Sequence, residues 1–234
     1  MIIISEWVEL LRKQKQLFKI NIQRNLIQNF SNSLTQQYQS IYLTALGADP
    51  IILGSIYSLS GVVNTLLSIP TGMTVDKIGV KKTLMVTALI SIIGALLFSI
   101  SNTWIIAALA LVLTSVGFNL NFTVCPMICG SVVKSSERVT VMGICDTITF
   151  FPFLISPMIA ASIITYYGGM TIAGIRPLFY LQIVGLLISL FFIVTKFFDP
   201  PVSETRSEIQ LISTLKKILS ETNSIKKNGY CCMC

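Results

Sequence analysis

Hydrophobic residues along the chain fall into long runs that short polar connections separate. A helix that crosses the hydrocarbon core of a bilayer needs about 20 mostly apolar residues. Six runs approach or exceed this length, at about residues 26–47, 51–75, 84–100, 104–133, 139–166 and 177–198. The pattern therefore predicts an all-α integral membrane protein with six transmembrane helices.

The two ends of the chain have a different pattern from the spans. Residues 1–25 place apolar side chains at helical spacing among five Lys and Arg residues, which predicts an amphipathic helix on the cytoplasmic leaflet. After Asp199-Pro200-Pro201, residues 199–234 are polar and form a predicted cytoplasmic connector or tail. The expected organisation is thus an N-terminal segment of residues 1–25, a six-helix bundle of residues 26–198 and a tail.

Short polar segments set the limits of the predicted spans. Asp49-Pro50 suits the start of the second span, since an acid is a good helix cap and proline fits the first turn. Residues 101–103, with the sequence Ser-Asn-Thr, form a predicted turn before the fourth span. Residues 168–176 form a predicted outer loop before the sixth.

The first predicted span is unusually polar. Asn29, Asn32, Ser33 and Gln36 share one side of the helix. Side-chain amides that face lipid are costly, so this stripe is expected to face either a watery cavity or another helix that it binds through hydrogen bonds. Asn119 in the fourth span is a further candidate for the cavity and its substrate.

Asp146 is the one acidic residue inside a predicted span. A charge at the centre of a membrane helix costs roughly 2.5 to 3.5 kcal/mol on insertion scales, so a cavity, a partner or a proton must relieve that cost. Two interpretations remain open. Asp146 either binds a proton or cation during function, or makes a polar contact with a neighbouring helix or the cytoplasmic interface.

Composition and charge support a membrane protein and give its orientation. Of the 234 residues, 53% are hydrophobic and only 12% are charged, about half the charge of a soluble domain. The net charge of +7 does not indicate nucleic-acid binding, because Lys and Arg are confined to connections and span ends. With the N-terminus inside, every Lys and Arg except Arg176 falls on the cytoplasmic side, which places both termini in the cytoplasm.

The absence of histidine from the sequence restricts the possible chemistry. It removes Ser-His and Cys-His nucleophile pairs and imidazole metal ligands, and no pair of acids lies within the spans, so we expect neither an enzyme, nor a metal, nor a cofactor. Cysteines in the spans are expected to be packing residues. Cys231, Cys232 and Cys234 are open to lipidation, metal capture or no role at all.

The connection between the second and third spans carries a recognisable motif, G-x-x-x-D-K-x-G-x-K-K. Its residues are Gly72, Asp76, Lys77, Gly79, Lys81 and Lys82. The motif resembles the signature turn between the second and third helices of major facilitator superfamily transporters. Glu137-Arg138 followed by Gly143 likewise resembles the entry to that family's fifth helix. Leu113 stands where the family often has an arginine, so no role is carried over to that position.

The resemblance implies a secondary transporter in the plasma membrane, in which two six-helix halves rock around a central site that takes a small solute. This chain corresponds to the N-terminal half and implies a partner, either a C-terminal half or a second copy. The motif would act as a conformational latch, or merely set topology, and Glu137 and Arg138 would join a cytoplasmic network. The sequence does not specify the substrate or the coupling ion. The alternative is an interrupted gene product that persists as a membrane scaffold without transport.

Overall fold

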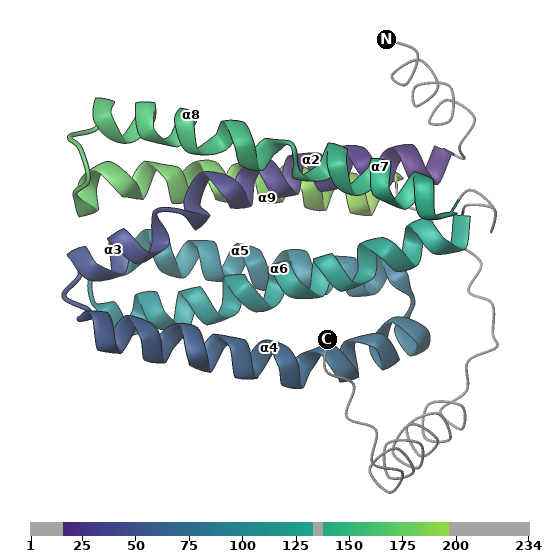
Figure 1. Ribbon diagram of the computed structural model, residues 1–234, viewed down its shortest axis with the longest axis horizontal. Coiled ribbons are helices and arrows are strands. Elements are labelled where there is room, and N and C mark those ends of the chain that lie inside the picture. The colour runs from purple at the N-terminus through teal and green to yellow at the C-terminus, as the bar shows by residue number, and fades with distance from the viewer. Residues whose placement is uncertain (1–15, 133–137, 197–234) are drawn as a thin grey trace, which may run out of the picture. The chain divides into compact units, whose positions relative to one another are not determined.

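The structure is a computed structural model that describes residues 16–132 and 138–196, and within them it leaves some helix-end side chains undescribed, including those of residues 69–77. The described chain contains helices and no strands (Figure 1). The helices are α2 (Gln16–Gln36), α3 (Gln39–Ala45), α4 (Pro50–Ile78), α5 (Val80–Ile100), α6 (Trp104–Val132), α7 (Arg138–Phe150), α8 (Pro152–Tyr166) and α9 (Ile172–Lys196).

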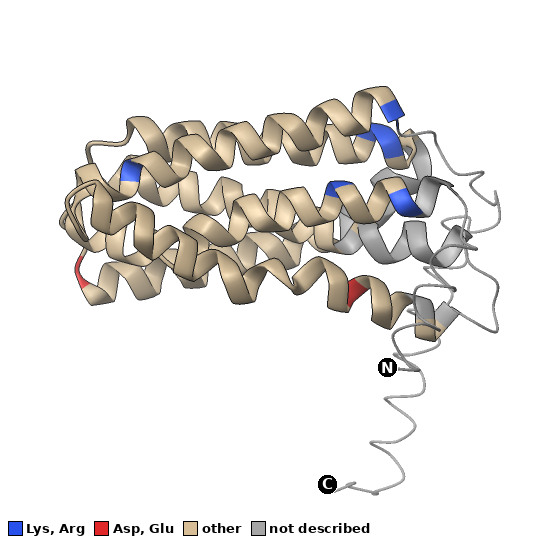
Figure 2. Cartoon of the chain, turned by 90° about the horizontal axis from the view of Figure 1, so that it is seen from above, with Lys and Arg blue, Asp and Glu red and all other residues tan. Residues whose placement is uncertain are grey.

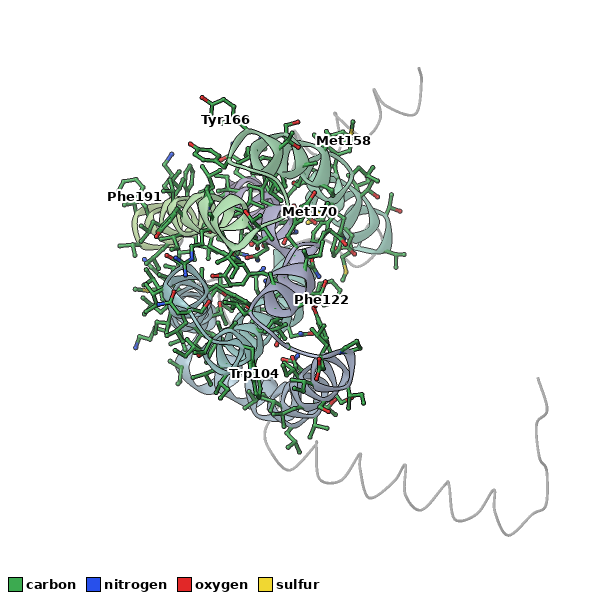
Figure 3. All side chains as sticks on the ribbon, turned by 90° about the vertical axis from the view of Figure 1, so that its left-hand side faces the viewer. Trp104, Phe122, Met158, Tyr166, Met170 and Phe191 are labelled. Atoms are coloured by element: carbon green, nitrogen blue, oxygen red, sulfur yellow. The ribbon has the colours of Figure 1, made fainter. Side chains whose placement is uncertain are left out.

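Five segments of the described chain are long and apolar enough to cross a membrane. They are Pro50–Ser68, Val80–Ile100, Trp104–Phe122, Met142–Tyr166 and Ile172–Lys196. Many of their large apolar side chains are exposed, and Met158, Tyr166 and Phe191 point away from the bundle (Figure 3). Such a surface suits hydrocarbon, and five of the six predicted spans are found in this way.

The first predicted span differs from the expectation. Instead of one apolar helix over residues 26–47, the chain forms α2 and then α3, with Tyr38 between them. Asparagine, glutamine and hydroxyl side chains make α2 too polar to count among the five apolar segments. These side chains are mostly buried against other helices, which removes the need for an apolar surface.

The helices form two groups that share a central contact. One group contains α4, α5 and α6, and the other contains α2, α7, α8 and α9 (Figure 1). Within the groups, α6 packs on α4 and α5, while α2 packs on α8 and α9. Contacts of α5 with α9 and of α2 with α6 join the groups.

This pattern of contacts repeats within the chain. The helices α2, α4 and α5 of a first half correspond to α6, α8 and α9 of a second half. The contact of α5 with α6 then corresponds to that of α9 with α2, and the contact of α4 with α6 to that of α8 with α2. The contact between α5 and α9 joins equivalent helices, as expected for two halves related by a pseudo-twofold axis. In this arrangement α2 takes the place in the first half that α6 takes in the second.

Residues 16–25, which were predicted as part of the N-terminal amphipathic segment, lie in the bundle instead. Helix α2 begins at Gln16, so residues 16–25 belong to the bundle and do not form a separate surface helix. Asn21, Arg24 and Asn25 are buried there, and the amide oxygens of the two asparagines accept hydrogen bonds from the guanidinium group of Arg24. Residues 1–15 and the predicted tail lie outside the described residues.

The connection that carries the motif is also shorter than expected. Only Gly79 separates α4 from α5, with φ of +93°, a conformation that glycine adopts without strain. The hydroxyl and the backbone N–H of Thr83 both donate to the carbonyl oxygen of Gly79. Charged residues on either side therefore extend the two helices, since lysine is a good helix former.

Two further differences concern the fifth and sixth spans. The fifth is divided at Phe151, because Pro152 has no N–H to continue the hydrogen bonding of α7. The sixth begins at Ile172, so the predicted loop of residues 168–176 is shorter and Arg176 lies inside α9. Gly168 and Gly169 make the turn, with φ of +106° and +81°.

One end of the bundle is fixed by an aromatic cluster and Arg176. The rings of Phe98 and Phe179 stack at 4.7 Å between centroids, and Tyr42 packs edge-on against both. Nη2 of Arg176 donates to the carbonyl oxygen of Ser101 at 2.8 Å. These contacts hold α3, α5 and α9 together.

Candidate functional site

A cavity of about 240 Å³ lies where the two groups of helices meet. Five helices contribute to its wall: α2, α3, α4, α6 and α9. The lining residues are Asn32, Gln36, Gln39, Tyr57, Ser60, Leu111, Thr114, Ser115, Phe118, Asn119 and Gln182. Nine of these eleven residues carry an amide or hydroxyl group, and most of the surface around these groups is apolar.

One wall of this cavity is a pair of buried amides. Nε2 of Gln182 on α9 donates to Oδ1 of Asn32 on α2 at 3.0 Å. The Thr35 hydroxyl donates to Oε1 of Gln182, also at 3.0 Å. The bond from Gln182 occupies Oδ1 of Asn32, while Nδ2 of Asn32 has no hydrogen-bond partner in the described part of the chain, although the residue is only 8% exposed. Asn32 thus offers a donor at the cavity.

The opposite wall is formed by hydroxyl and amide groups of α4 and α6. The hydroxyls of Ser60 and Ser115 lie 2.6 Å apart, and Nδ2 of Asn64 lies 3.4 Å from the same Ser115 oxygen. Nδ2 of Asn119 donates to the backbone carbonyl oxygen of Ser115 at 2.9 Å. This wall joins the two helices and still presents polar groups to the cavity.

The structure separates the predicted polar stripe of the first span into two kinds of residue. Asn32 and Gln36, together with Asn119 of α6, line the cavity. Ser33 instead binds the hydroxyl of Ser156 on α8 at 2.6 Å, and Asn29 donates to the carbonyl oxygen of Thr149 on α7. Asn32 and Gln36 therefore fit the cavity interpretation of the stripe, whereas Ser33 and Asn29 fit the interpretation of hydrogen bonding between helices.

A second, smaller cavity of about 40 Å³ contains the predicted acidic candidate. Asp146 is exposed and lies at this cavity, whose lining residues are Asn25, Asn29, Phe118, Asn121, Phe122, Asp146, Thr149 and Phe150. Asp146 is thus separate from the larger cavity, although Phe118 lines both.

A buried arginine next to this small cavity was missed by the sequence analysis. Arg24 is fully buried, and its Nη1 atom donates to Oε1 of Gln28 and Oδ1 of Asn121, each at 2.8 Å. Its Nη2 atom donates to Asn21 and Asn25. A signal was available in the sequence, because Asn21 and Gln28 lie three and four positions from Arg24, a spacing that brings side chains together on one face of a helix.

Gln182 was also missed. It is the polar residue at the centre of an apolar span, and polar side chains inside membrane helices are costly enough to mark functional positions. The pairing of residues 150 positions apart could not be deduced from helical periodicity.

The motif residues lie at one end of the bundle. Nζ of Lys81 donates to the carbonyl oxygen of Val194 on α9 at 3.1 Å, and Lys82 is exposed. The described part of the structure excludes Glu137 entirely. It also leaves out the side chains of Asp76, Lys77 and Arg138 and the surroundings of Gly72. Most of the described Lys and Arg residues lie toward this same end, as Figure 2 shows.

Metal-binding groups are not found in the described part of the chain, where no cluster of three His, Cys, Asp or Glu residues occurs. Cys145 is buried and is not in a disulfide. The three cysteines at the C-terminus lie outside the described residues.

Comparison with known proteins identifies the family. A search of curated proteins finds no match. The family model described as Major Facilitator Superfamily matches residues 26–230, which is most of the chain. This match confirms the resemblance seen in the motif, and with five apolar helices it indicates a multi-pass membrane protein. The chain belongs to the major facilitator superfamily, a family of membrane transporters.

Proposed function

We propose that this protein is a secondary transporter of small solutes that works by alternating access, with the larger cavity as its part of the substrate site. The observation that supports this most is the set of amides and hydroxyls around a 240 Å³ cavity within apolar, membrane-spanning helices. Polar groups at such a depth are costly, and a solute pathway gives a reason for them. Sites of this kind lie between structural repeats.

In the proposed topology the chain crosses the membrane six times and both termini lie in the cytoplasm. The proposed location is the plasma membrane. Helices α2 and α3 supply the additional crossing, supported by the equivalence of α2 and α6 in the packing. The concentration of basic residues near the start of α5 and the end of α9 supports the orientation.

A second six-helix half, either a C-terminal half or a second copy of this chain, would complete the proposed site. Helices α4 and α8 are candidates for the contact, since their large apolar side chains are widely exposed. Leu59 and Leu66 on α4 are 57% and 67% exposed, and Leu154 and Met158 on α8 are both 73% exposed. In this proposal, Asp76 and the nearby lysines form the latch that releases as the halves rock.

Asp146 is the proposed coupling residue, for a proton or another cation. Its exposure at a small cavity allows a cation to reach the carboxylate. The same cavity is lined by Asn25 and Asn121, which both accept hydrogen bonds from Arg24. The buried guanidinium group of Arg24 is therefore bonded to two residues that line the same cavity as the Asp146 carboxylate.

The test is solute uptake by the full chain in proteoliposomes, with a panel of radiolabelled solutes inside and outside to allow counterflow. Saturable uptake that exceeds that of empty liposomes supports the proposal. If no solute moves when the chain is reconstituted alone, or together with a separately encoded second half, the chain is not a transporter and the scaffold alternative stands.

A further inference from the structure

We propose that the larger cavity binds an uncharged solute that carries several hydroxyl groups and has about the size of a monosaccharide. Asn32 and Gln182 provide its central hydrogen-bonding pair. This inference depends on the proposed function, because it names the substrate class of the same site. It is carried by the chemistry of the lining residues.

The first argument concerns charge. Among the described residues that line the larger cavity, none is Asp, Glu, Lys or Arg. A charged solute would find no counter-charge on this chain's part of the site, and losing its hydration there is strongly unfavourable. The charged side chains of this region are placed elsewhere: Asp146 lines the smaller cavity, and Arg24 is held by its own four amide partners.

The second argument concerns the kind of hydrogen bond that the lining offers. Amide and hydroxyl side chains can each donate and accept, unlike carboxylates, lysine or arginine. Solute hydroxyls have the same double capacity, so they match such a lining at many positions. Asn32 adds a specific requirement, because its side chain is nine-tenths buried and its Nδ2 donor has no hydrogen-bond partner among the described residues. A solute oxygen would satisfy it.

The third argument concerns size and shape. The volume of about 240 Å³ lies below the range of about 300–1,000 Å³ that is typical of sites for drug-sized ligands. Leu111 and Phe118 add an apolar surface between the polar walls. A small ring or chain with C–H groups between its hydroxyls would contact both kinds of surface.

The experiment measures equilibrium binding of radiolabelled probes to the purified full chain in detergent. The uncharged probes are glucose, galactose and mannitol, and the charged probes are glucuronate and glucosamine. We expect at least one uncharged probe to bind, and both charged probes to bind about tenfold more weakly or worse, which corresponds to about 1.4 kcal/mol. Equal or tighter binding of a charged probe would overturn the inference, as would failure of all three uncharged probes to bind.

Variants test whether the assigned residues are responsible. Asn32→Ala should weaken binding of the uncharged probe by about fivefold to tenfold, because it removes the buried donor. Asn32→Asp should move the preference toward glucosamine by adding a negative charge. If either Asn32 variant fails to fold, Asn119→Ala offers a second test, because Asn119 lines the same cavity but is exposed.

The matched control is Asn102→Ala, which removes an exposed amide that binds Arg176 at the end of the bundle and does not line the cavity. It should bind as the unaltered chain does. If Asn102→Ala weakens binding as much as Asn32→Ala and Asn119→Ala do, the site is not where we place it.

The two proposals fail in different ways. Transport of charged solutes alone would overturn the substrate class and leave the transporter function intact. Binding of an uncharged probe at Asn32 without transport in any reconstituted assembly would overturn the transporter function while the binding site stands.

Discussion

Nη1 of Arg24 on α2 donates a 2.8 Å hydrogen bond to Oδ1 of Asn121 on α6, and Arg24 is fully buried. The two residues lie on helices that occupy equivalent positions in the two halves of the contact pattern. A buried guanidinium group requires hydrogen-bond partners, and four amide oxygens accept bonds from the Nη1 and Nη2 atoms of Arg24. The bond to Asn121 therefore connects the two groups of helices through a buried charged group.

Asn121→Ala tests the contribution of this bond. The substitution removes an acceptor from a buried charged group, and hydrogen bonds to charged groups are worth about 1.5–3 kcal/mol. We expect the free energy of unfolding in detergent to fall by about that amount, with a lower melting temperature. Thermal unfolding followed by circular dichroism or by loss of the monodisperse peak measures the change.

Asn119→Ala is the matched control for stability. It removes the same side chain from the same helix, but Asn119 is exposed and donates to the carbonyl oxygen of Ser115 on its own helix. Exposed substitutions usually change stability by less than about 0.5 kcal/mol. An equal loss in both variants would mean that the bond to Arg24 has no special importance.

Close packing of α5 and α6 gives a second prediction. A Cβ atom added at Gly94 would lie 2.7 Å from Cγ2 and 2.9 Å from the backbone nitrogen of Thr114. Small residues allow membrane helices to approach in this way. Gly94→Ala should therefore destabilise the protein by about 1–3 kcal/mol through overpacking.

Gly61→Ala is the control for this substitution. Gly61 also lies within a helix, and a Cβ atom there would have nothing within 4 Å. Alanine has the better helix propensity by about 1 kcal/mol, so this variant should be as stable as the original or slightly more so. Thermal unfolding of both variants in the same detergent measures the difference in stability. If Gly94→Ala is as stable as the original chain, α5 and α6 are less closely packed than described.

The limits of most helices were predictable because local chemistry determines them. Proline at position 50 starts a helix, glycine at position 79 ends one, and the turn at residues 101–103 separates α5 from α6 as expected. These features act within a few residues of one another. The breaks near Tyr38 and Phe151 were missed, since an uninterrupted polar or apolar pattern runs through both.

The site was only partly predictable, for a physical reason. Periodicity showed that Asn32 and Gln36 share a face, and both line the cavity. It could not show that Gln182 would bind Asn32, or that four amides would surround Arg24. A basic residue near the N-terminus was taken as a surface charge, because the cost of burying it is offset only by partners that the folded structure brings together.

The latch hypothesis gives the third prediction. Asp76→Asn removes the negative charge that is proposed to hold the outward-facing state, so it should abolish uptake by proteoliposomes without reducing the amount of protein inserted. Asp49→Asn makes the same change at the other end of α4, on an exposed residue, and should transport normally. Unimpaired uptake by Asp76→Asn would exclude the latch.

Coupling through Asp146 gives the fourth prediction. If its carboxylate carries a proton during transport, uptake by the original protein should vary with the pH on each side of the membrane. Asp146→Asn cannot titrate and should lose this dependence while still exchanging solute. Uptake rates over a range of imposed pH gradients measure the effect, and a retained pH response in Asp146→Asn would assign coupling to another group.

The number of crossings can be measured by labelling introduced cysteines, in a background from which the natural cysteines have been removed. Met170→Cys lies in the turn between α8 and α9, and Lys82→Cys lies at the start of α5. An impermeant thiol reagent should label the first from outside intact cells and the second only after permeabilisation.

Ala45→Cys, at the exposed end of α3, tests whether α2 and α3 together make the additional crossing. Lys19→Cys, an exposed position near the start of α2, completes this test. Labelling of Ala45→Cys from outside and of Lys19→Cys only after permeabilisation requires that α2 and α3 cross the membrane. Labelling of both from outside would leave five crossings. Labelling of Ala45→Cys only after permeabilisation would place both ends of α4 on one side of the membrane, which a single straight helix of 29 residues does not allow.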